Sequence, residues 1–321
     1  MNSARPDFYD LIARNRRRTW LLMAAFFLLL AAVGLIISVA LGGGITGAVL
    51  AGLGAFAVTF FAYRSSAGVA LRATRAVPAD PTEFAQLHNL IESMALAAAI
   101  PKPAVYVVHD PAPNAFATGR TPETAAVAAT TGLLEKMDRA ELEGVMAHEI
   151  AHIRNGDIRV MTVAVATAGA IALIADVFFR IVYWNVLTGS SSRRRNDRND
   201  GGTNAILILA AVVLAILAPL AASLLRAAVS RSREALADAT AVELTRYPTG
   251  LRSALEKLDH DVTVVQHTSH ATSHLWIESP DDHENKRGGR WVNDLFSTHP
   301  PLSDRINLLR AMEGLPPYPV S

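Results

Sequence analysis

Two histidines separated by three residues have the spacing needed to bind one metal ion. His148 and His152 frame the sequence His-Glu-Ile-Ala-His, and residues four apart on a helix lie on the same face, one above the other. Two neutral imidazoles suit zinc, and Glu149 between them is placed to take a proton from a water molecule at the metal. This is the H-E-x-x-H pattern of zinc proteases.

The residues around the motif predict that it lies on a helix. Asp138 has the character of a helix-capping residue, and Glu141, three residues on, completes a capping box. Asn155 and Gly156 supply a stop signal just after His152. The alternative is a pair of surface histidines with an ordinary solvated glutamate between them.

A catalytic zinc ion takes three protein ligands and leaves a fourth position open to water. The chain has no cysteine, so the third ligand must be a histidine or a carboxylate. Glu234 and Asp238 lie four residues apart, which fits a glutamate ligand followed by an aspartate that accepts the free N–H of a ligating histidine. By itself, the segment would favour an amphipathic juxtamembrane helix with solvated charges.

The chain is more apolar than an average soluble protein, with 51% hydrophobic and 18% charged residues. The excess begins with two uncharged runs, Trp20–Leu41 and Ile45–Tyr63, separated by a glycine-rich connection. Each run is long enough to cross a bilayer as a helix, so we expect a transmembrane hairpin. A cleaved signal peptide is the competing interpretation of the first run, but a second spanning run follows it at once.

Arginines predict the orientation of this hairpin. Basic residues flank both of its ends, and the positive-inside rule assigns them to the cytoplasm. The absence of cysteine agrees with that side. The net charge of +1 gives no reason to expect nucleic acid binding. The arginines concerned are Arg14, Arg16, Arg17, Arg18, Arg64, Arg72 and Arg75.

Two further apolar runs, Val160–Ala175 and Ala205–Leu225, predict a second hairpin. Asp176 and Arg180 follow the first of them one helical turn apart, which favours a salt bridge. The arginine-rich loop at residues 189–203 leaves open whether this hairpin crosses the membrane. Because the histidines precede it and Glu234 follows it, an even number of crossings is required between them.

The expected fold is mostly α with a small β-sheet: an integral membrane protein with two apolar helical hairpins and a cytoplasmic zincin-like metalloprotease domain. Residues 81–96 have a helical pattern, and residues 104–108 and 125–129 are short β-rich runs. The expected divisions are an N-terminal segment with the first hairpin (1–63), the first half of the protease domain (64–158), the second hairpin (159–228) and the second half of the protease domain (229–321).

Four blocks of the sequence resemble the HtpX-type membrane zinc metalloproteases, which are relatives of the CAAX-processing protease of the endoplasmic reticulum. The sequence departs from the family at Trp276, where relatives have phenylalanine, and at Ala235, where they often have an aromatic residue. The blocks are residues 114–119, residues 148–157, residues 233–238 and residues 296–306.

This resemblance implies a set of site residues and one zinc ion per chain. His148, His152 and Glu234 would be the ligands. Glu149 would be the general base, and Asp238 would support a ligand. His299 would lie near the active site and donate to the oxyanion of the tetrahedral intermediate, with Arg305 bracing the region. An edge strand that pairs with an extended substrate is expected at Asn114, Ala115, Phe116, Ala117, Thr118 and Gly119.

The leading hypothesis is a membrane-bound zinc endopeptidase in the cytoplasmic membrane of a prokaryote. By resemblance, its substrates would be polypeptides, chiefly misfolded or damaged membrane proteins. Two alternatives are a membrane adaptor that keeps zinc only as a structural staple, and a site-two-type protease with its motif inside the bilayer. Four protein ligands would indicate the adaptor, and the charges near the motif oppose the second alternative. The histidines of residues 259–293 fit no compact second metal site.

Overall fold

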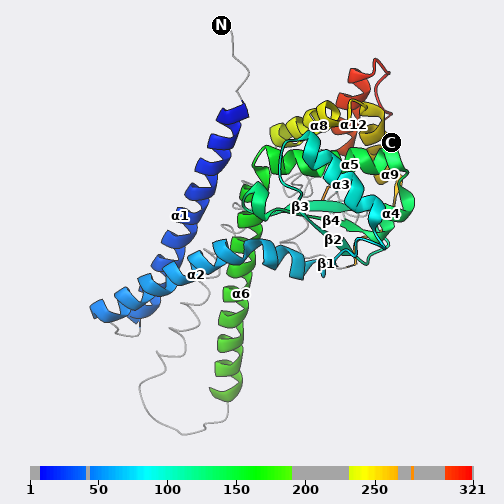
Figure 1. Ribbon diagram of the computed structural model, residues 1–321. Helices are drawn as coiled ribbons and strands as arrows, with labels where there is room; N and C mark the ends of the chain where they lie inside the picture. Colours follow the sequence, from blue (N-terminus) through cyan, green and yellow to red (C-terminus); the bar gives the residue numbers. More distant parts are fainter. Residues whose placement is uncertain (1–7, 41–43, 190–230, 267–275, 278–300, 320–321) are drawn as a thin grey trace. The chain divides into compact units, whose positions relative to one another are not determined.

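The computed structural model describes residues 8–40, 44–189, 231–266, 276–277 and 301–319 (Figure 1). The described strands are β1 (Val77–Pro78), β2 (Ala104–Val108), β3 (Ala115–Thr118) and β4 (Ala126–Thr130), with a 3₁₀ turn at Pro122–Thr124. The described α-helices are α1 (Phe8–Ala40), α2 (Gly44–Ala73), α3 (Ala85–Ala97), α4 (Thr131–Lys136), α5 (Arg139–Arg154), α6 (Asp157–Gly189), α8 (Arg231–Thr245), α9 (Pro248–His260) and α12 (Leu302–Met312).

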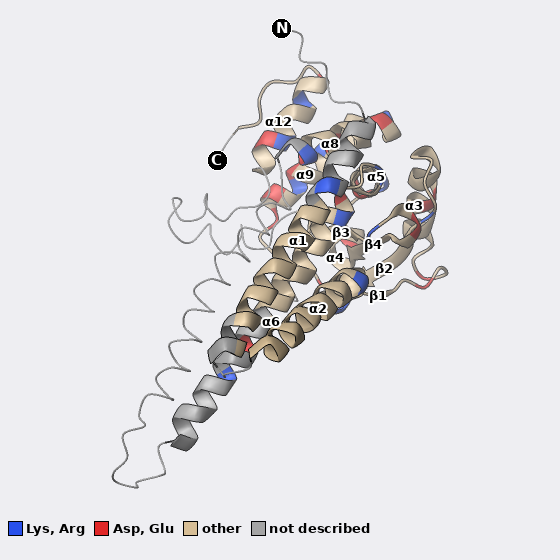
Figure 2. Cartoon of the chain, turned by 90° about the vertical axis from the view of Figure 1, so that its left-hand side faces the viewer, with Lys and Arg blue, Asp and Glu red and all other residues tan. Residues whose placement is uncertain are grey.

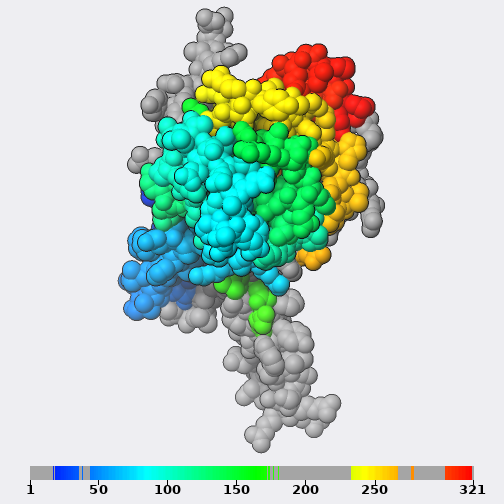
Figure 3. Space-filling view, turned by 45° about the vertical axis from the view of Figure 1, so that its right-hand side comes forward, coloured from blue at the N-terminus to red at the C-terminus, as the bar shows by residue number. Residues whose placement is uncertain are grey.

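The chain divides into two compact units. The first takes its described residues from the ranges 1–20, 65–165 and 225–321, and the second from 21–64 and 166–224. Within the first unit, segments far apart in the sequence pack together, as the adjoining cyan, green, yellow and red surfaces of Figure 3 show. We call this unit the catalytic unit and the second one the apolar unit.

The sheet of the catalytic unit is mixed, with the strand order β1-β2-β4-β3. The β2 and β4 strands are parallel, whereas β1 and β3 pair antiparallel with their neighbours. The sequence predicted β2 with its observed bounds, and β4 begins one residue later than expected. Because β3 has one partner strand in the described part of the chain, it lies at the edge of the sheet.

Side chains of the sheet alternate between two apolar cores. Ala115 and Ala117 of β3 belong to a core shared with α3, α5 and α9, whereas Phe116 belongs to a core shared with the first turns of α6. Trp276 packs edge to face on Phe116, with ring centroids 4.8 Å apart. The sheet therefore supports α5 on one face and α6 on the other.

The α5 helix begins and ends at the residues that the sequence predicts. The Asp138 carboxylate accepts from the Glu141 N–H at 2.9 Å, and the Glu141 carboxylate accepts from the Asp138 N–H at 2.8 Å. After Arg154 the chain turns through Gly156, whose φ of 71° favours glycine. Almost every residue from Glu141 to Ile153 is buried, because α3, α8, α9 and β3 pack around the helix.

The α5 and α9 helices approach so closely that glycine is required on both. A Cβ atom at Gly144 would lie 2.5 Å from the backbone nitrogen of Leu251. One at Gly250 would lie 2.5 Å from the carbonyl oxygen of Ala140. This contact sets the distance between the helix that carries both histidines and its neighbour.

In the apolar unit, α1 and α2 are also in close contact, since a Cβ atom at Gly34 would lie 2.7 Å from that of Ala51. Among the described helices, α2 alone is long and apolar enough to cross a membrane, and α1 carries a shorter apolar stretch, Thr19–Leu35. In Figure 2, tan ribbon without blue or red marks the long uncharged stretches of both helices. The apolar run 205–225 lies outside the described residues, so the second hairpin and the membrane sidedness stay predictions.

The expected salt bridge on α6 is present. Arg180 Nε donates to Asp176 Oδ2 at 2.8 Å, and both side chains are exposed. This pair is the ordinary i,i+4 interaction that the sequence favoured over a functional site.

Candidate metal centre

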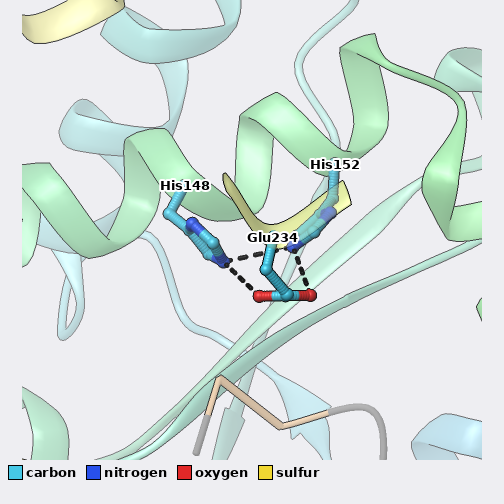
Figure 4. Close-up of side chains that lie close together, drawn as sticks. All are labelled: His148, His152 and Glu234. Atoms are coloured by element: carbon cyan, nitrogen blue, oxygen red, sulfur yellow. Dashed lines mark hydrogen bonds and ion pairs between the residues drawn. The ribbon is translucent and has the colours of Figure 1, made fainter. Parts of the chain in front are cut away.

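His148, His152 and Glu234 turn their side chains toward one point (Figure 4). The Nε2 atoms of the two histidines are 3.1 Å apart. His148 Nε2 lies 3.6 Å from Glu234 Oε2, and His152 Nε2 lies 3.6 Å from Glu234 Oε1, so each imidazole faces its own oxygen of the carboxylate. Among the described residues, no fourth histidine or carboxylate belongs to this group.

These separations fit a tetrahedral metal ion. Bonds of about 2.0–2.1 Å at tetrahedral angles place two donor atoms about 3.3 Å apart, and the observed separations are 3.1 and 3.6 Å. The two histidines come from successive turns of α5, and Glu234 comes from the first turn of α8. The geometry therefore has three protein donors around one position.

The three side chains are buried, at 1% exposure for His148, 4% for His152 and 2% for Glu234. Burial at this depth reduces the contact of the carboxylate and the imidazoles with water, which strengthens their electrostatic interactions.

His148 is oriented by a carboxylate and an arginine. Its Nδ1–H donates to Asp238 Oδ1 at 2.9 Å. Arg305 donates two hydrogen bonds to the same carboxylate, from Nη2 to Oδ1 at 2.7 Å and from Nε to Oδ2 at 3.0 Å. Arg305 also donates through Nη1 to the carbonyl oxygen of Ile277 at 3.2 Å. Asp238 and Arg305 therefore lie on the side of His148 that faces away from the metal position. The resemblance implied a supporting role for both residues.

His152 has a corresponding partner that the sequence did not single out. Its Nδ1 lies 3.2 Å from Asp157 Oδ2, on the first turn of α6. The other oxygen of Asp157 lies 3.9 Å from Arg233 Nε. Asp157 and Arg233 both lie in sequence blocks that resemble the HtpX-type proteases. The signal that could have identified Asp157 is its position five residues after the second histidine of the motif.

The charged groups around the metal position are mostly acidic. Burial and Arg305 lower the pKa of His148, but hydrogen bonds to Asp238 and Glu234 raise it to about 9. Burial raises the pKa of Asp238, but Arg305 and His148 lower it to about 2. When both histidines are neutral, two arginines face four buried carboxylates, so a divalent cation that displaces the proton of His148 would balance the ionised site. The groups counted are Arg233, Arg305, Glu149, Asp157, Glu234 and Asp238.

Glu149 lies between the two histidines in sequence and is also buried, at 2% exposure. Burial raises the pKa of its carboxyl group, and the nearby charges of His148 and His152 oppose that shift. A carboxylate with a raised pKa binds protons more readily near neutral pH, which suits a group that takes and returns a proton.

The expected substrate segment forms β3. Asn114 accepts a backbone hydrogen bond from Thr130 N at 2.9 Å, so Asn114 faces β4. With antiparallel alternation, the backbone groups of Ala115 and Ala117 face the outer edge. At Ala115 this edge is already in use, because its carbonyl accepts from Ile277 N at 2.9 Å and its N–H donates to the Asn114 side chain. Ala117 is the next outward-facing position.

Two expectations concern residues that are only partly described. His299 lies outside the described residues, so its predicted role stays a prediction. Of the histidines in residues 259–293, His260 alone is described, and its Nδ1 lies 2.7 Å from the carbonyl oxygen of Glu256. That contact ties His260 to its own helix.

Comparison with known proteins identifies the family. Residues 81–313 match the family model described as peptidase family M48. The chain belongs to peptidase family M48. This M48 chain is 44% identical over 304 residues to "Protease HtpX homolog" of Caldanaerobacter subterraneus subsp. tengcongensis, covering 95% of this chain and 97% of that protein. It is 46% identical over 310 residues to the protein of that name in Limosilactobacillus reuteri, covering 95% and 99%.

A solved structure titled "Crystal Structure of S. mikatae Ste24p" is similar with a TM-score of 0.45 and 18% identity, covering 79% of this chain and 56% of that one. The family and the HtpX homologues confirm the resemblance that the sequence suggested. The M48 chain is a metalloprotease, a hydrolase that requires a metal and acts on polypeptides. The HtpX homologues and the apolar helix α2 indicate a membrane protein.

Proposed function

We propose that this M48 protein is a zinc endopeptidase in which His148, His152 and Glu234 hold the metal. The observation that carries the proposal is the convergence of three buried donors at separations of 3.1 and 3.6 Å. Zinc is favoured over harder cations because two of the three donors are imidazole nitrogens. Zinc, when bound, lowers the pKa of water and polarises the scissile carbonyl.

The residues of the chain supply the proton transfers and the alignment. Glu149 takes a proton from the attacking water and delivers it to the leaving amine. Its raised pKa supports this role, because a stronger base accepts the proton and the resulting acid can release it. Asp238, which accepts hydrogen bonds from Arg305, also accepts the Nδ1–H of His148, and this directs the Nε2 lone pair toward the metal position. His299 is proposed as the donor to the oxyanion.

The substrate is proposed to bind as an extended strand along the outer edge of β3, within residues 114–119. Ala117 would supply the first pair of backbone hydrogen bonds, because its N–H and C=O face outward while those of Ala115 are occupied. Hydrogen bonds to the substrate backbone depend little on the amino-acid sequence of the substrate. This mode of binding therefore suits unfolded polypeptides of different sequence.

We further propose that the protein degrades misfolded or damaged membrane proteins, with its catalytic unit on the cytoplasmic side. The similarity to proteins named HtpX homologs and the presence of α2 support a membrane setting. Arginines around the first apolar hairpin support the sidedness. The second hairpin is proposed to place both parts of the metal centre on one side of the membrane.

The alternative functions fit the site less well. An adaptor with a structural zinc ion would need a fourth protein ligand, and the group within the described residues contains three. A motif inside the bilayer conflicts with the charged and polar network around α5, since Glu141 pairs with Lys257 at 2.5 Å and Arg154 lies near Glu243.

The decisive experiment compares Glu149→Gln with the matched control Glu143→Gln on the same helix, both as full chains purified in detergent. The first variant should keep its zinc and lose peptide-bond cleavage by several orders of magnitude, because only the proton acceptor is removed. The control should keep both. Cleavage by Glu149→Gln at the rate of the unmodified protein would reject the assigned base, and a protein that takes up no zinc would reject the metal centre.

A further inference from the structure

We propose that Asp157 and Arg233 are positioning residues for the second histidine of the metal centre. The proposal rests on the proposed function, because it assumes that His152 binds the metal. The sequence motifs alone assign neither residue a role. In the structure, Asp157 contacts the imidazole nitrogen of His152 that points away from the metal position.

The contacts of Asp157 and Arg233 with His152 resemble those of Asp238 and Arg305 with His148. His148, Asp238 and Arg305 form one chain, with 2.9 Å between histidine and carboxylate and 2.7 Å between carboxylate and arginine. In the second chain, the corresponding separations are 3.2 Å, from His152 to Asp157, and 3.9 Å, from Asp157 to Arg233. Both aspartates are at least as buried as the ligands they contact.

Asp157 is suited to select one tautomer of His152. An ionised carboxylate only accepts hydrogen bonds, so it favours the proton on Nδ1 and leaves the Nε2 lone pair directed at Glu234 and His148. A carboxylate at 1% exposure needs a positive partner, and Arg233, at 6% exposure, is that partner. The longer distances predict a weaker effect than that of the Arg305 chain.

The arrangement joins three elements. Arg233 precedes the proposed ligand Glu234 on α8, so a single helical turn would provide both a metal ligand and the counter-ion for the partner of His152. Asp157 is the first residue of α6, which continues without interruption to Gly189. The position of His152 is therefore linked to the start of a helix that continues into the apolar run.

The test measures metal affinity rather than activity. Asp157→Asn keeps the size and the acceptor oxygen but removes the charge, and Asp176→Asn, an exposed position on the same helix, is the matched control. Zinc dissociation constants would be measured by chelator competition on the full chain in detergent. Removing such a partner typically weakens metal binding about 10–100-fold. We expect about tenfold for Asp157→Asn, more for Asp238→Asn and no change for the control.

Cobalt substitution provides a second measurement, because the visible absorption of Co²⁺ reports the geometry of its ligands. The Asp157→Asn spectrum should differ from that of the unmodified protein, and Arg233→Met should shift affinity in the same direction by a smaller factor. If Asp157→Asn does not fold, the zinc affinity and cobalt spectrum of Arg233→Met test the proposal. Unchanged affinity and an unchanged cobalt spectrum in the folded variants would overturn the positioning role. Failure of the unmodified protein to bind zinc would overturn the proposed function instead.

Discussion

The contact between α5 and α9 allows a prediction with a calculable size. A methyl group at Gly144 would lie 2.5 Å from Leu251 N, 2.7 Å from Leu251 Cα and 2.9 Å from the backbone carbon of Gly250. Ordinary contacts begin at 3.4 Å, so Gly144→Ala would force the two helices apart by up to about 0.9 Å. All three atoms belong to the backbone, so no side chain can rotate away.

Two terms determine the change in unfolding free energy. Overpacking costs about 1–3 kcal/mol, and the rigid neighbours place this case at the upper end. Alanine is the better helix former by about 1 kcal/mol, which offsets part of that cost. The expected net loss is about 2 kcal/mol, equivalent to a decrease of about 4–8 °C in melting temperature for a domain of this size.

The assay is thermal unfolding of the zinc-loaded protein in detergent, followed by circular dichroism. Gly68→Ala on α2 is the control, because a Cβ atom there meets nothing within 4 Å, and it should melt at the same temperature or slightly higher. Since His148 lies one turn after Gly144, the Gly144→Ala variant should also bind zinc more weakly. A melting temperature equal to that of the unmodified protein would refute the inferred close packing.

Three other changes test separate parts of the structure. Asp138→Ala removes the cap of α5 and should lower the unfolding free energy by about 1 kcal/mol in denaturant titration, and an unchanged midpoint would mean that the cap adds nothing. Trp276→Ala empties a fully buried site against Phe116 and should cost about 3–5 kcal/mol, with a smaller loss for Trp276→Phe. In chelator-treated protein, the pKa of His148 is about 9, above its usual 6.5. The stabilisation that this raised pKa provides is therefore fully present below pH 6.5 and is lost as the pH rises to about 9. Melting temperatures that do not change between these pH values would contradict the raised pKa of His148.

Local sequence determined the elements whose signals lie within a few residues. Asp138 and Glu141 mark the start of α5 because a capping box needs only residues three apart. The strand β2 was predicted with its observed bounds, from a short run of β-branched and aromatic residues. The spacing of His148 and His152 put both imidazoles on one helix face for the same reason.

Tertiary structure alone decided what depends on residues distant in sequence. Most of α5 between Glu141 and Ile153 is buried, because α3, α8, α9 and β3 pack against it. The contact of Gly144 with Leu251, and the bond from Ile277 to Ala115, join segments separated by more than a hundred residues. The approach of Asp157 to Arg233 also depends on how α6 and α8 pack. No periodicity encodes these pairings, because packing of whole elements determines them rather than the preferences of neighbouring residues.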